Sequence, residues 1–118
     1  MDAAFKVHTT LGPGLLESVY EACLCQELKQ RAIPFEAQVP VPVVYEGVTL
    51  DAGLRLDLLV GDAVVVEIKA VEKMLPLYEA QELTYLKLAG RRLGLLINFN
   101  VPVIREGIKR IVYDTPQN

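Results

Sequence analysis

The sequence predicts an α/β domain with a mixed β-sheet flanked by helices. Helical and strand-like segments follow one another in the order α-α-β-β-β-α-β-β, which fits a sheet with helices on its faces. The segment Val64-Val65-Val66 is apolar at every position, as in a central strand that is covered on both sides. With 118 residues, 52% of them hydrophobic, the chain has the size of one domain with a buried core, and we expect that domain to span residues 1–118.

Three segments have the apolar spacing of amphipathic helices. Residues 2–11 form the first, which ends at Gly12-Pro13-Gly14. Residues 15–31 form the second and residues 74–89 the third, where Gly90 and the basic pair after it are typical of a helix C-terminus.

The strand segments are rich in β-branched and aliphatic residues. The first contains Pro40 and Pro42, which cannot donate ladder hydrogen bonds, so we expect it at an edge of the sheet. A short stretch at residues 48–50 and a bend at 51–53 lead into the second. The predicted strands are residues 38–45, 54–59, 63–69, 93–99 and 108–113.

The composition excludes several classes of protein. The apolar fraction excludes a disordered chain, and no apolar run reaches the roughly 18 residues of a transmembrane helix. The N-terminus lacks the basic flank and following apolar stretch of a signal peptide. The two cysteines, Cys23 and Cys25, cannot form a disulfide with each other on a helix. We therefore expect no membrane association and a cytoplasmic location.

Charge is distributed unevenly along the chain. Residues 1–86 contain 6 basic and 13 acidic residues, whereas residues 87–118 contain 6 basic and 2 acidic ones. The net charge of −3 argues against a protein that coats nucleic acid by charge alone. The basic end is either an ordinary solvated surface or a grip on a phosphate backbone. On the second interpretation, the expected nucleic-acid contacts are Arg91, Arg92, Lys109 and Arg110.

Three charged residues, Asp57, Glu67 and Lys69, stand inside the two most hydrophobic strands. Charges in such positions are costly unless they are paired or used, so the three are either a structural ion pair or a functional site. Two close carboxylates with solvent access can hold Mg²⁺ or Mn²⁺, because these ions prefer oxygen ligands. A lysine on the same face can orient or deprotonate a water molecule or neutralise phosphate charge.

The register of the hairpin decides whether these charges meet. With a two-residue loop at residues 61–62, Asp57 and Glu67 lie on opposite faces of the sheet. With a three-residue loop at residues 60–62, Asp57 pairs with Val65 and all three charges share a face. We favour the second register because it gathers the charges instead of burying them singly.

The spacing Asp-x9-Glu-x-Lys, formed by Asp57, Glu67 and Lys69, resembles the core of the PD-(D/E)XK nuclease superfamily. The segment Gly14-Leu15-Leu16-Glu17-Ser18-Val19-Tyr20 is similar to the G-x-x-E-x-x-Y signature of the GxxExxY family within it. The resemblance covers nearly the whole chain, with its blocks in order. The further blocks are Val7-His8, residues 11–14, 55–57, 67–70, 80–87 and 94–99.

This resemblance implies a restriction-endonuclease-like core and a nuclease that hydrolyses phosphodiester bonds with Mg²⁺ or Mn²⁺. Asp57 and Glu67 would be metal ligands, and Lys69 the water-orienting base. Glu17 would be an additional acidic residue at the metal, and Gln81 a further catalytic residue beside it. The simpler interpretations are that Glu17 is an acid favoured by the dipole at a helix N-terminus and that Gln81 is solvated.

Two tyrosines lie one helical turn beyond these residues: Tyr20 follows Glu17, and Tyr85 follows Gln81. They are candidate contacts to nucleic acid or half-buried core aromatics.

The sequence leaves three functions open. The first is the nuclease, acting on DNA or RNA. The second is a catalytically silent module of the same fold, which binds nucleic acid or a protein partner through the edge at residues 39–45. The third is a purely structural domain. We expect a homodimer, because a small nuclease-like domain often needs a partner to grip a duplex.

Overall fold

The structure is a computed structural model that describes residues 1–114, so the last four residues of the predicted domain lie outside it. The described chain contains three α-helices, a short 3-10 helix and seven strands. In order, they are α1 (Asp2–Leu11), α2 (Glu17–Gln30), β1 (Phe35–Pro40), β2 (Val43–Tyr45), β3 (Val48–Leu50), β4 (Arg55–Val60), β5 (Val64–Lys69), α3 (Pro76–Ala89), β6 (Leu93–Asn98), η1 (Ile104–Gly107) and β7 (Ile108–Val112).

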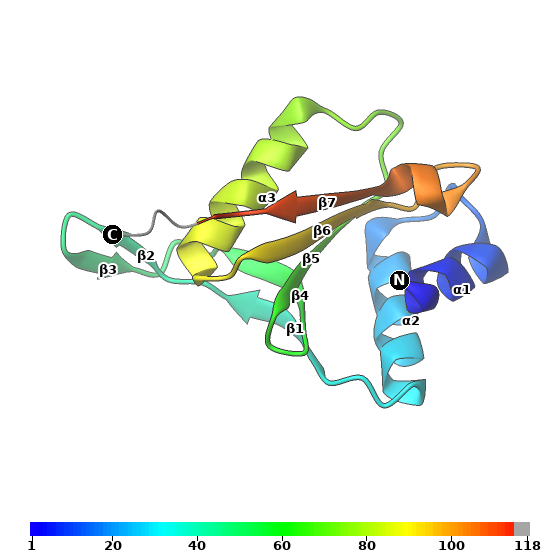
Figure 1. Ribbon diagram of the computed structural model, residues 1–118, viewed down its shortest axis with the longest axis horizontal. Helices are drawn as coiled ribbons and strands as arrows, with labels where there is room; N and C mark the ends of the chain where they lie inside the picture. The colour runs from blue at the N-terminus through cyan, green and yellow to red at the C-terminus, as the bar shows by residue number, and fades with distance from the viewer. Residues whose placement is uncertain (115–118) are drawn as a thin grey trace.

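Five of the strands form a mixed sheet in the order β1-β4-β5-β6-β7 (Figure 1). β5 and β6 are parallel and are connected through α3, whereas the other neighbouring strands are antiparallel. Helices α1 and α2 lie on one side of the sheet and α3 on the other (Figure 1). The predicted mixed sheet with helices on its faces is confirmed.

Alternate residues of β5 pack on opposite faces, which explains why Val64, Val65 and Val66 are all apolar. Val66 belongs to the core under α1 and α2, where Tyr20 stacks on Phe99 with ring centroids 4.6 Å apart. Val65 faces α3 and packs with Leu86. The sheet is therefore the middle layer of the molecule, and its α3 face also carries the polar side chains described below.

The predicted edge strand at residues 38–45 is partly wrong. β1 is an edge strand, but it begins at Phe35 and ends at Pro40. After it, the Val41 N–H donates to the Leu54 carbonyl at 2.9 Å, and Pro42 has no N–H to continue the ladder. β2 then pairs only with β3, as a hairpin that projects away from the sheet (Figure 1).

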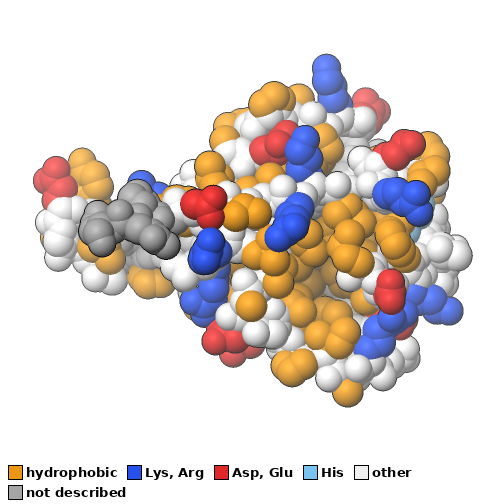
Figure 2. Space-filling view, viewed as in Figure 1, with side chains coloured by type: hydrophobic (Ala, Val, Ile, Leu, Met, Phe, Trp, Pro, Cys, Tyr) orange, Lys and Arg blue, Asp and Glu red, His pale blue; other side chains and the backbone are white. Residues whose placement is uncertain are grey.

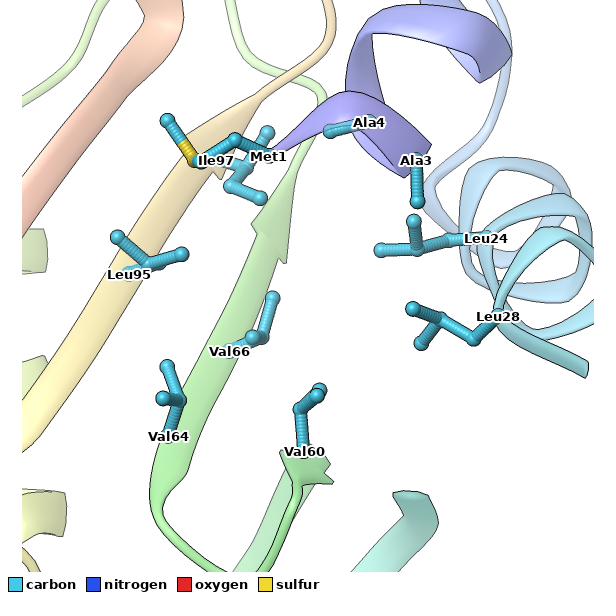
Figure 3. Close-up of a pocket in the computed structure, with 10 residues that line it drawn as sticks. All are labelled: Met1, Ala3, Ala4, Leu24, Leu28, Val60, Val64, Val66, Leu95 and Ile97. Atoms are coloured by element: carbon cyan, nitrogen blue, oxygen red, sulfur yellow. The ribbon is translucent and has the colours of Figure 1, made fainter. Parts of the chain in front are cut away.

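An apolar hollow of about 160 Å³ remains between the sheet and helices α1 and α2 (Figure 3). Its lining residues come from both helices and from β4, β5 and β6. They are Met1, Ala3, Ala4, Leu24, Leu28, Val60, Val64, Val66, Leu95 and Ile97. Within residues 1–114, no helix is long and apolar enough to cross a membrane.

Candidate active site

The hairpin of β4 and β5 has a three-residue loop, but neither predicted register is correct. Val60 pairs with Val64, so the loop consists of residues 61–63 and the ladder, if continued, sets Asp57 opposite Glu67. The first two loop residues have positive φ angles of 60° and 54°, as in a type I′ turn. The Ala63 N–H donates to the Val60 carbonyl at 3.1 Å and closes this turn. Ala63 then remains as an extra loop residue, which shifts the register one step from the two-residue prediction.

At Asp57 and Glu67, hydrogen bonds to side-chain oxygens replace the backbone hydrogen bonds between β4 and β5. The last backbone pair is Leu58 with Val66. Beyond it, Ile68 N–H donates to Asp57 Oδ2 at 2.8 Å, and Asp57 N–H donates to Glu67 Oε1 at 3.3 Å. Each carboxylate thus accepts a bond from the opposite strand, and the two lie together where the strands separate.

On its other side, β4 has a second irregularity at the same level. Gln38 of β1 lies beside Asp57 in the antiparallel register and has a positive φ of 53°. Irregular strand geometry of this kind often redirects a side chain next to a functional site. Gln38 Nε2 donates to both carboxylate oxygens of Glu21, at 2.9 and 3.1 Å.

Glu67 is only 7% exposed. Burial, followed by the negative charges of Asp57 and Glu82, raises the pKa of Glu67 to about 9. Without a cation, Glu67 therefore holds a proton at neutral pH. A positive ion between the carboxylates would oppose that shift, because it favours the charged form.

Lys69 lies two residues after Glu67, on the same face of β5. Its Nζ is 4.8 Å from the centroid of the Tyr78 ring, which comes from the first turn of α3. A cation over an aromatic face is attracted by the ring, so Tyr78 restrains the ammonium group. The structure thus brings Asp57, Glu67 and Lys69 together, as expected from the favoured register, although the register itself differs.

Glu82 was missed from the sequence. It is completely buried on α3, and within residues 1–114 neither of its carboxylate oxygens has a hydrogen-bond partner. Its pKa is raised to about 8, by burial first and by the charge of Asp57 second, against the lowering effect of the positive charge of Lys69. The available signal was its position four residues from both Tyr78 and Leu86, on the apolar stripe of the helix.

Glu21 was also missed, although it follows the predicted Glu17 by one helical turn. Burial raises the pKa of Glu21, the hydrogen bond from Gln38 opposes this, and the charges of Asp57 and Glu17 raise it again. Glu17 itself is exposed at the first position of α2. Among the residues that the structure describes, no three His, Cys, Asp or Glu side chains are arranged to hold a metal ion. The ligand role of Glu17 therefore stays a prediction.

The two predicted residues of α3, Gln81 and Tyr85, are both half-buried. The pKa of Tyr85 is raised by burial and by the charges of Glu67, Asp57 and Glu82. The catalytic role of Gln81 and the nucleic-acid contact of Tyr85 stay predictions.

Tyr20 is not a nucleic-acid contact, and this prediction is wrong. The side chain is completely buried against Phe99. Its hydroxyl donates to the Gly12 carbonyl at 2.7 Å and accepts from the Leu15 N–H at 3.1 Å. The tyrosine of the signature segment therefore fastens the turn between α1 and α2 to the core.

Three of the four predicted basic contacts form ion pairs. Arg91 lies 2.8 Å from Asp62, Arg92 3.1 Å from Asp114, and Lys109 3.5 Å from Glu79. The fourth, Arg110, is exposed on β7 next to Lys109. Adjacent residues of a strand point to opposite faces, so these two do not form one patch.

A divalent cation fits the residues of this site. Asp57 and Glu67 offer oxygen donors, which Mg²⁺ and Mn²⁺ prefer. Nearby, the two carboxyl oxygens of Glu82 have no hydrogen-bond partner among the residues described, so a cation would favour the charged form of this group as well.

A family model described as the PD-(D/E)XK nuclease superfamily matches residues 1–111. No curated protein and no solved structure gives a significant match to the chain. The mixed five-stranded sheet flanked by helices agrees with a restriction-endonuclease-like fold. The match covers nearly the whole sequence, and the paired acidic residues lie where two central strands separate. This chain therefore belongs to the PD-(D/E)XK nuclease superfamily.

Proposed function

We propose that this protein is a Mg²⁺- or Mn²⁺-dependent nuclease of the GxxExxY type that hydrolyses phosphodiester bonds in DNA or RNA. The observation that supports it best is the meeting of Asp57 and Glu67 at the end of the β4–β5 ladder. Membership of the superfamily supports the reaction class. Its members also supply the expectation of a divalent metal.

Asp57 and Glu67 would hold the cation, and Glu67 would release its proton when the cation binds. When bound, such an ion stabilises charge on the phosphoryl oxygens and lowers the pKa of a water molecule. Lys69, held over the Tyr78 ring, would orient that water or neutralise the phosphate. Gln81, Tyr85 and Glu17 would contact substrate or water at the margins of the site.

The first experiment measures cleavage of single- and double-stranded DNA and RNA with Mg²⁺, Mn²⁺ or EDTA. Asp57→Asn and Lys69→Met are expected to lower the metal-dependent rate by about a thousandfold. Circular dichroism should show that both variants fold. Glu106→Gln, a change at an exposed acid in η1, is the matched control and should cleave like wild type.

Absence of cleavage by wild type with every substrate and both metals would contradict the nuclease proposal. Binding of nucleic acid without turnover would then identify the protein as a silent module of the same fold. We also propose that the protein is a homodimer and that it is cytoplasmic. Light scattering tests the homodimer.

A further inference from the structure

Glu82 occupies a position that an apolar residue would fill in an ordinary helix. It faces the sheet from the middle of α3, it is completely buried, and its two oxygens lack partners among residues 1–114. A buried carboxyl group without hydrogen bonds lowers stability. Some favourable role has to offset that cost, or a leucine would serve the fold better.

The neighbouring strand leaves space for this carboxyl group. Gly94 of β6 lies beneath it, and a Cβ at that position would collide with the Glu82 carboxylate. Gly94 pairs with Val65, which precedes Glu67 by two residues on the same face of β5. Glu82 and Glu67 therefore lie on the same side of the sheet, in the layer between the strands and α3.

Other groups of the site act on Glu82 directly. The charges of Asp57 and Lys69 both change the pKa of Glu82, and Glu82 in turn changes that of Glu67. The geometry agrees with this, because Asp57 and Glu67 meet at the end of the ladder and Lys69 reaches Tyr78 of α3 from the same face of β5. The carboxyl group thus adds a third acid to the pair that ends the ladder.

We propose that Glu82 strengthens binding of the divalent cation at Asp57 and Glu67 by offering a buried, unpartnered carboxyl group that carries its negative charge when the cation is bound. This inference rests on the proposed metal dependence. Glu82 needs no bond to the ion, in keeping with the lack of a three-ligand group among the described residues. Its charge would act from within the buried layer between the strands and α3, where an electrostatic attraction is stronger than in water.

Isothermal titration calorimetry with Mn²⁺ alone tests the inference without measuring cleavage. Glu82→Gln keeps the shape of the side chain and removes the charge, so its Mn²⁺ affinity is expected to fall by about tenfold. Glu79→Gln is the matched control, because Glu79 lies one turn earlier on α3, where it pairs with Lys109 near the surface. Its affinity should equal that of wild type.

Thermal unfolding of the metal-free protein gives the second readout. Glu82→Leu is expected to melt above wild type, because an apolar side chain replaces an unpartnered carboxyl group. Glu79→Leu should show no such gain. If Glu82→Gln does not fold, Glu82→Leu takes its place in the calorimetry.

The outcomes separate the two proposals. Wild type that binds Mn²⁺ no better than Glu82→Gln overturns the role of Glu82 and leaves the nuclease proposal intact. Wild type that binds no Mn²⁺ overturns both proposals. A tenfold loss in Glu82→Gln alone, with a higher melting temperature for Glu82→Leu, supports the inference.

Discussion

At the scale of residues, Asp57 performs the task of a backbone carbonyl. Its Oδ2 accepts the Ile68 N–H that β4 would otherwise bond through its main chain. Because the side chain is longer than a carbonyl group, β4 can move away from β5 without leaving a buried donor unpaired. The same exchange carries the carboxylate between the strands, next to Glu67.

Raising the pH is expected to destabilise the metal-free protein. The pKa of Glu67 is about 9 in the folded state against 4.5 ordinarily, so the folded protein keeps a proton that the unfolded chain releases. Between these values the free energy of unfolding falls as pH rises, by about 1 kcal/mol per pH unit. Melting temperatures measured in EDTA from pH 5 to 8.5 should fall. Glu67→Gln should make the fall shallower and leave the part that comes from the raised pKa of Glu82. A melting temperature independent of pH would contradict this.

At the scale of elements, α3 and β6 are matched to each other. Tyr78, Glu82 and Leu86 face the sheet along one stripe of the helix. Opposite Glu82, β6 has Gly94, whose lack of a side chain leaves space for the carboxyl group. The end of β6 is matched to α2 in a similar way, because Phe99 stacks on Tyr20. Both helices are therefore held at fixed positions around the acidic pair.

Gly94→Ala is expected to destabilise the protein by about 1–3 kcal/mol, because the added methyl group collides with the Glu82 carboxylate. Urea unfolding measures this cost. In Gly94→Ala combined with Glu82→Ala the collision is gone, so the double variant should be more stable than the sum of the two single losses implies. Strict additivity of the two changes would show that these residues do not press on each other.

At the scale of the whole molecule, the basic residues of the C-terminal part do not form a continuous surface. Figure 2 shows Lys and Arg side chains scattered among hydrophobic ones on the viewed face. Arg91, Arg92 and Lys109 are paired with acids, although such exposed pairs contribute little to stability and open easily. A nucleic acid would have to compete with these acids for the cations.

Arg110 is expected to contribute more to nucleic-acid binding than Arg91, which is paired with Asp62. Arg110→Gln should lower the slope of log affinity against log salt by about one, because one phosphate contact is lost. Arg91→Gln should change the slope less. Fluorescence anisotropy with a labelled oligonucleotide, at several KCl concentrations in Ca²⁺, measures both. Equal slopes for Arg110→Gln and wild type would remove Arg110 from the interface.

The sequence by itself determined the architecture and the acidic pair with its lysine. Apolar spacing separates helices from strands, since their side-chain periods differ, and a charge inside a buried strand stands out at once. Asp57, Glu67 and Lys69 could therefore be recognised without coordinates. Because side chains alternate along a strand, choosing a loop with an odd number of residues was enough to put the three charges on the same face.

Only the tertiary structure decided the register, the burial of Tyr20 and the presence of Glu82. Registers two steps apart put the same residues on the same face, so the pattern cannot separate them. The pairing of Val60 with Val64, which leaves Ala63 as an extra loop residue, does. Tyr20 and Glu82 are placed by contacts with Phe99 and Gly94, which are far away in the chain. Such contacts form only when helices pack on the sheet, and no local pattern records them.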